Sequence, residues 1–151
     1  MEDWRRIDID ALDPENNITA EDLAPEVPPV SADEVQSIIS NIRTLISKGS
    51  YSDAILYATE QAPYGADESS KTQFLSSVID VLSATKQTEI PSIIKQLSIE
   101  QQNALIKFLY KGMATKKGQQ QGGVLLSWFD KTVEVTGMGP VVRYLSDRRT
   151  I

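Results

Sequence analysis

The sequence predicts an all-α fold with about seven helices, stacked as antiparallel helical hairpins in a superhelix-like arrangement, behind an extended N-terminal arm. Apolar residues recur at the three- and four-residue spacing of helices, and no segment alternates as a half-buried strand would. Two capping-box signals, at Ser31 and Ser98, mark helix starts. Four of the seven prolines stand in residues 1–30. This distribution favours a division into an arm (1–30) and a helical domain (31–151).

The arm is acidic as well as proline-containing. It holds nine acidic residues against two arginines, whereas residues 31–151 hold 13 basic and 12 acidic residues. This composition predicts an extended segment that does not pack by itself. Residues 4–10 combine a tryptophan, two arginines and β-branched residues, and such residues are frequent at interface hot spots. Two interpretations stand: a linear arm that orders on a partner, and a solvated tail with an incidental tryptophan.

The first helix is predicted to begin after Ser31, because Ser31 and Glu34 form a capping box. Six apolar residues then follow one face and predict a buried stripe: Val35, Ile38, Ile39, Ile42, Leu45 and Ile46. Gly49 is expected to end this helix. A short second helix is expected over about 52–61, because Pro63 stops it.

Two further helices are expected before Ser98. One covers about 67–83, with Asp67 and Glu68 in its first turn, where negative charge complements the helix dipole. Its apolar residues are spaced for one face: Phe74, Leu75, Val78, Ile79 and Leu82. The other helix begins near Thr88 and tolerates Pro91 in its first turn. Its expected buried residues are Ile90, Ile93, Ile94 and Leu97.

Three more helices are expected after Ser98. The first carries a stripe of Leu105, Ile106, Leu109 and Met113, and the second carries Leu125, Trp128, Phe129 and Val133. The ring of Trp128 is expected to be buried. Gly137 suits the left-handed position after a helix, and Pro140 suits the first turn of the last helix, before an exposed basic end.

The segment 114–123 between these stripes is polar, glycine-rich and lysine-bearing. No strand is predicted before it, and it lacks the GxxxxGK[ST] order of a phosphate-binding loop. The prediction for this segment is a flexible loop.

The composition argues against most enzyme classes. The chain has no histidine, the commonest general base and metal ligand, and no cysteine for thiolate or disulfide chemistry. Asp130 and Glu134 share a helix face, but Lys131 lies between them, which is typical of a solvated surface. Neither a GxSxG nucleophile motif nor a calcium-binding loop occurs. We therefore predict a protein that is not an enzyme, with no catalytic residue, metal site or cofactor.

Nucleic acid and membrane are not expected partners. The helical domain has no basic stripe beyond its two last arginines. No run of about 18 apolar residues is present that could cross a membrane. The first ten residues lack the apolar core of a secretion signal, and the lack of cysteine is compatible with a reducing cytosol.

The last third of the sequence resembles a known family. Four motifs occur in the family's order and spacing, at residues 110–112 (YKG), 125–128 (LLSW), 137–145 (GMGPVVRYL) and 148–151 (RRTI). They are similar to the closing motifs of the smallest-subunit family of the actin-related protein 2/3 complex, which nucleates branched actin filaments. Further similarity upstream extends the resemblance over nearly the whole chain.

The resemblance implies a structural subunit of that complex, placed in the cytoplasm on the actin cytoskeleton and reaching actin filaments through the complex. It implies that the helical body docks on the propeller subunit and a neighbouring core subunit. The body residues expected at these interfaces are Tyr110, Lys111, Arg143, Arg148 and Arg149. It also implies that the arm reaches an actin-related subunit, through Trp4, Arg5, Arg6, Ile7, Asp8 and Asp10.

An alternative of a different class is a stand-alone adaptor that binds a peptide in a groove between helices. The two hypotheses differ in the amount of free protein that they predict. A permanent subunit should have almost no free monomer, whereas an adaptor should have a free monomer pool.

Overall fold

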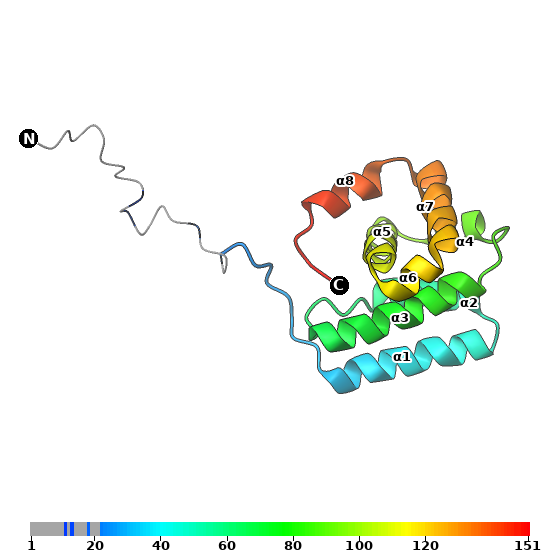
Figure 1. Cartoon of the computed structure of the whole chain (residues 1–151), viewed down its shortest axis with the longest axis horizontal. Coiled ribbons are helices and arrows are strands. Elements are labelled where there is room, and N and C mark those ends of the chain that lie inside the picture. The colour runs from blue at the N-terminus through cyan, green and yellow to red at the C-terminus, as the bar shows by residue number, and fades with distance from the viewer. Residues whose placement is uncertain (1–10, 12, 14–17, 19–21) are drawn as a thin grey trace, which may run out of the picture.

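The computed structural model describes residues 11, 13, 18 and 22–151, and this part of the chain is helical without strands (Figure 1). The all-α prediction is confirmed. The helices are α1 (Ala32–Ser47), α2 (Tyr51–Glu60), α3 (Glu68–Ala84), α4 (Ile90–Gln96), α5 (Ile99–Ala114), α6 (Lys116–Gln120), α7 (Gly122–Thr136) and α8 (Gly139–Ser146).

Helices α1 and α3 lie side by side along one edge of the body (Figure 1). The predicted capping box starts α1: the Glu34 amide donates to Ser31 Oγ at 3.3 Å, and the Ser31 amide donates to Glu34 Oε2 at 2.8 Å. The predicted apolar face of α1 is confirmed, with Val35, Ile39 and Ile42 buried and its other three members half-buried.

The start of α3 differs slightly from expectation. Asp67 precedes the helix as its N-cap and accepts hydrogen bonds from the amides of Ser69 and Ser70 at 3.0 and 3.1 Å. These bonds satisfy two of the amides that a helix start leaves without partners. They also hold the pKa of the Asp67 carboxyl below its usual value, with the Ser70 hydroxyl making the largest contribution.

Helix α5 lies in the middle of the fold, in contact with α2, α3, α6, α7 and α8 (Figure 1). The Ser98 capping box forms as predicted, and Leu105, Ile106 and Leu109 are fully buried. Phe108 packs edge-on against Phe74 of α3, with ring centroids 5.6 Å apart. The central position of α5 explains why its sequence is apolar on more than one side.

Trp128 fastens α7 to α3. Its side chain is 0% exposed, as predicted, and its indole Nε1 donates a hydrogen bond of 3.0 Å to the carbonyl of Leu82. That carbonyl lies in the last turn of α3, where a helix leaves carbonyl groups unpaired. The end of α7 also agrees with expectation, since Gly137 has a φ of 72° and Pro140 lies in the first turn of α8.

The segment 114–123 was predicted to be a flexible loop, and this prediction is wrong. Most of it is the short helix α6 and the start of α7, so the described chain has eight helices where about seven were expected. Lys117 pairs with Asp80 of α3 at 2.6 Å and donates to the carbonyl of Ser76 at 2.9 Å. A Cβ at Gly118 would collide with the carbonyl of Gly112, so the glycine allows α6 to lie close against α5.

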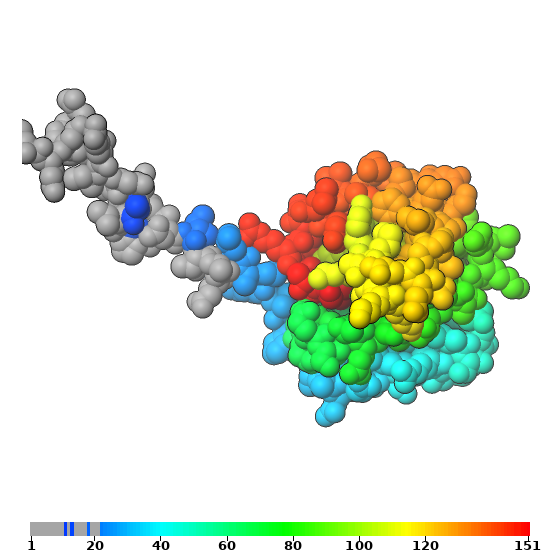
Figure 2. Space-filling model, viewed as in Figure 1, coloured from blue at the N-terminus to red at the C-terminus, as the bar shows by residue number. Residues whose placement is uncertain are grey.

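After α8 the chain turns back toward α3. Figure 2 shows this last segment, residues 147–151 in red, lying next to the green atoms of α3. Lys71 of α3 donates a hydrogen bond of 3.3 Å to Thr150 Oγ1, and the side chain of Ile151 is buried. The expectation of an exposed end is therefore wrong for Ile151, although Arg148 and Thr150 are exposed.

Candidate functional site

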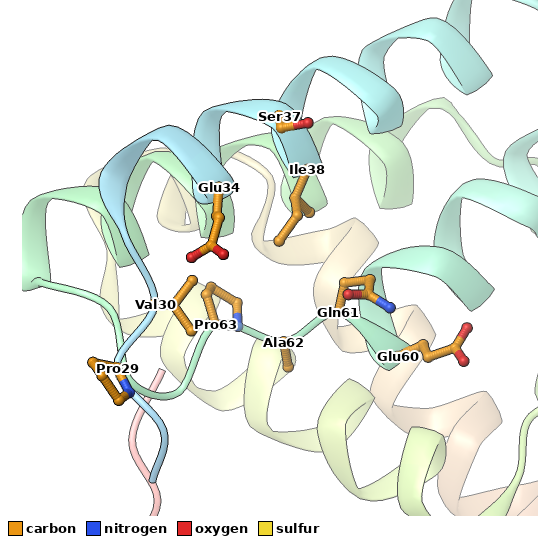
Figure 3. Close-up of a pocket in the computed structure, with 9 residues that line it drawn as sticks. All are labelled: Pro29, Val30, Glu34, Ser37, Ile38, Glu60, Gln61, Ala62 and Pro63. Carbon is orange, nitrogen blue, oxygen red and sulfur yellow. The ribbon is translucent and has the colours of Figure 1, made fainter.

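Among the described residues, no group of three or more His, Cys, Asp or Glu residues is placed to hold a metal ion. A hollow of about 420 Å³ lies beside the start of α1. In Figure 3, Glu34 and Ile38 project from α1 toward Val30 and Pro63. The Glu34 carboxylate serves the helix cap, accepting from the amide of Ser31 at 2.8 Å and from its hydroxyl at 3.0 Å. The Glu34 carboxylate, which lines this hollow, therefore already has hydrogen-bond partners within the chain.

The predicted interface residues fall into two sets. Trp4, Arg5, Arg6, Ile7, Asp8 and Asp10 lie outside the described residues. The other five lie in the part of the molecule built by α5, α8 and the segment 147–151, with α7 packed beside them. The structure thus brings the second set to one region, although the five side chains differ in their surroundings.

Tyr110 is held between two other aromatic rings. Its ring stacks on Tyr144 of α8, with centroids 4.5 Å apart and planes 6° from parallel, and meets the edge of Phe129 of α7 at 5.5 Å. Both are favourable arrangements for aromatic pairs. Half-buried Tyr110 therefore joins α5 to α7 and α8 within this chain, which makes it a packing residue beside the surface.

Arg149 is engaged inside the chain. Its guanidinium donates to both carboxylate oxygens of Asp147, from Nε to Oδ1 at 3.1 Å and from Nη2 to Oδ2 at 2.8 Å. Lys107 of α5 donates to Asp147 Oδ2 at 2.6 Å and to the Arg149 carbonyl at 2.9 Å. Both cations lie over the ring of Tyr64, at 4.5 Å for Lys107 Nζ and 4.8 Å for Arg149 Cζ. This cluster of charges fastens the segment 147–151 to α5.

The electrostatics of this cluster follow from those contacts. The hydrogen bonds from the Arg149 guanidinium hold the pKa of the Asp147 carboxyl well below its usual range, and Lys107 adds to the effect. Burial lowers the pKa of Lys107, although the pair with Asp147 opposes the shift. Burial also disfavours the charged form of Tyr64 and therefore raises its pKa. The carboxylate is therefore a fixed anion that two cations share.

The remaining predicted residues are closer to solvent. Arg143 is exposed, and its Nε donates to Asn103 Oδ1 at 2.8 Å. Arg148 is exposed, and its Nη1 donates to the carbonyl of Leu23 at 3.2 Å. Lys111 is half-buried and has no ion-pair partner in the part of the chain that the structure describes. These three cations are available to another molecule, whereas Arg149 is largely occupied.

Three exposed apolar residues at the last helix were not predicted from the sequence. Met138, Val142 and Leu145 are 58%, 61% and 77% exposed. Their spacing of four and three residues places them within an arc of about 60° on a helix. That spacing is visible in the sequence, but no role was predicted for these residues. We call these three residues the α8 stripe.

The described residues contain no helix that could span a membrane.

Comparison with known proteins gives a consistent result. A family model described as "ARP2/3 complex 16 kDa subunit (p16-Arc)" matches residues 3–151. A Saccharomyces cerevisiae protein named actin-related protein 2/3 complex subunit 5 is 44% identical over 151 residues, which cover 99% of this chain and 98% of the relative. A Xenopus laevis subunit 5-B and a human subunit 5-like protein are 29% and 30% identical, each over 98% of this chain and 94% of the relative. The similarity thus spans nearly the whole chain.

Proposed function

The chain belongs to the ARP2/3 complex 16 kDa subunit (p16-Arc) family, and we propose that it is a non-catalytic structural subunit of an ARP2/3 complex that supports the nucleation of branched actin filaments. The observation that carries this proposal is the 44% identity, over almost the full length of both chains, to a relative named as subunit 5 of that complex. The exposed cations and apolar stripe at α8 suit a protein whose surface is used by neighbouring chains.

In this proposal the two parts of the chain have separate tasks. The helical body, 31–151, docks on the propeller subunit and a core subunit, and its interface lies around α8 and the end of α5. The arm, 4–10, reaches an actin-related subunit. A tether of this kind acts through effective concentration, because it keeps a partner near its docking site without fixing it rigidly. Trp4 and Ile7 supply apolar area, and Arg5 and Arg6 supply charge-assisted hydrogen bonds.

A purification from cells tests the proposed membership. The full chain, carrying an affinity tag and replacing the untagged protein, is isolated, and the accompanying proteins are identified and quantified. We expect stoichiometric bands that include actin-related subunits, and almost no free monomer on size exclusion. A large free pool without stoichiometric partners would contradict the proposal and favour the adaptor, whose peptide would occupy a groove such as the hollow beside α1.

Removal of residues 1–10 tests the arm. The truncated chain is reconstituted into the complex, and subunit stoichiometry after dilution and branch formation on actin filaments are measured. We expect the truncated subunit to remain in the complex while the actin-related subunit is retained less well and branching falls. Full retention with unchanged branching would mean that the arm is a solvated tail.

A further inference from the structure

The α8 stripe has no cover within the described part of the chain. Helix α8 has only eight residues, a length at which a helix is marginal without tertiary contacts. Its opposite side supplies those contacts, since Pro140 and Val141 are buried and Tyr144 stacks on Tyr110. In Figure 2 the orange-red atoms of α8 form an outer edge of the body. Tertiary contacts therefore stabilise α8, although the three large apolar side chains of the stripe are exposed to solvent.

A basic hollow continues from one end of the stripe. Leu145 lines a hollow of about 270 Å³ together with Lys107, Lys111, Asp147 and Arg149. The single carboxylate in this set, Asp147, is already paired with Lys107 and Arg149. Lys111 is therefore the cation whose charge no described residue of this chain neutralises. A segment bound to this surface would contact the apolar side chains of the stripe and, next to them, the ammonium group of Lys111.

We propose that the α8 stripe and the adjoining hollow form the docking surface for an amphipathic segment of another subunit, with apolar side chains on the stripe and a carboxylate that pairs with Lys111. This inference rests on the proposed function, because it assigns the surface by which the subunit joins its complex. The positive charge of this surface favours a partner that carries negative charge. Lys111 lines the hollow beside Leu145, and Arg143 is exposed on the same helix as the stripe, so a partner that removes water from this surface must supply negative charge.

A second copy of this chain does not fit the same surface. A symmetric dimer places identical patches against each other, so Lys111 and Arg143 of one copy would face the cations of the other. The only side-chain carboxylate among the hollow's lining residues, that of Asp147, is held by Lys107 and Arg149. A patch-to-patch contact between two copies is therefore disfavoured, and the occupant is a different chain with an acidic apolar segment.

The test is a competition for assembly with full-length chains. Wild-type and variant subunits with different tags are mixed with the remaining subunits of the complex, and their ratio in the assembled complex is measured. Val142→Asp and Leu145→Asp test the stripe, and Lys111→Glu tests the hollow. Ile99→Asp is the matched control, because Ile99 is similarly exposed at 63% but lies at the start of α5. Circular dichroism and thermal unfolding of each free chain verify folding.

We expect each stripe variant to enter the complex at least about tenfold less than wild type, as for loss of an interface hot spot. Lys111→Glu should enter about three- to tenfold less, and Ile99→Asp should equal wild type. Leu145→Ala, which adds no charge and removes little buried area, should show a smaller loss in the same direction. If wild type assembles and the stripe variants assemble equally well, this inference is overturned while the proposed function stands. If wild type itself does not assemble, the proposed function fails.

Two other outcomes would also overturn the inference. An equal loss with Ile99→Asp would mean that any added surface charge disturbs assembly. Binding of the free chain to phosphatidylcholine vesicles containing phosphatidylserine, lost with Leu145→Asp while assembly is unchanged, would assign the stripe to a lipid surface.

Discussion

Helices α5 and α8 both carry apolar stripes, but the two stripes lie in opposite surroundings. Leu105, Ile106 and Leu109 of α5 are fully buried among neighbouring helices. The α8 stripe is more than half exposed at each of its three residues. The difference shows that helical spacing of apolar residues identifies the face of a helix that favours burial. The residues that bury this face can belong to the same chain or to another chain.

The largest expected effect belongs to the buried side of this comparison. Trp128→Ala should lower the free energy of unfolding by about 3–5 kcal/mol, because it leaves a cavity and an unpaired Leu82 carbonyl at the end of α3. Urea unfolding followed by circular dichroism measures it. The matched control, Leu145→Ala on the exposed stripe, should change stability by less than about 0.5 kcal/mol. A Trp128→Ala chain that unfolds like wild type but does not enter its complex would make the indole an interface residue instead.

The same contrast is expected between two lysines one turn apart on α5. Lys107→Met keeps the aliphatic stem but removes the bonds to Asp147 and the Arg149 carbonyl, and should cost about 1.5–3 kcal/mol of stability. Lys111→Met should leave stability nearly unchanged, because Lys111 has no ion-pair partner among the described residues. Thermal unfolding of both variants compares them. Equal destabilisation by the two substitutions would remove the distinction between an internal and an available cation.

A smaller effect is expected from pH at Asp147. Its pKa is lowered in the folded chain by Arg149 and Lys107, so its contribution to stability is present above the unfolded aspartate pKa of about 3.9 and is lost as pH falls below that value. The stability difference between wild type and Asp147→Asn should therefore be full near neutral pH and shrink on acidification. Urea unfolding at a series of pH values measures this difference. Two curves that stay parallel below the unfolded pKa would show that Asp147 is not paired as described.

Local sequence signals predicted much of the helical body, because both capping boxes and the stripes of α1 and α5 depend on residues close in sequence. Helix α6 was missed because its stability comes from distant contacts, such as Lys117 with Asp80. Composition alone suggested a loop there. The internal engagement of Arg149 was also missed. Its carboxylate partner, Asp147, is only two residues away, but Tyr64, over which the guanidinium lies, is distant in sequence.

The candidate site was predicted less completely than the fold. Lys111, Arg143 and Arg148 were selected and lie near the surface of one region, but Tyr110 is a packing residue shared by three helices. The apolar stripe of α8 was overlooked, since periodicity does not reveal whether a face is covered. The residues of the arm, 4–10, lie outside the described part of the chain, and their role stays a prediction.

The rates of methionine oxidation at two sites compare the two helices directly in the wild-type protein. Met138 lies on the exposed α8 stripe, whereas Met113 of α5 is half-buried and packs against the core. Sulfoxide formation follows exposure of the sulfur, so dilute peroxide and peptide mass spectrometry report both sites in one sample. We predict that Met138 oxidises faster than Met113 in the free chain, and that assembly slows Met138 at least about fivefold while Met113 is unchanged. Oxidation of Met138 at the same rate in the free and assembled chain would contradict the assignment of the α8 stripe to an interface.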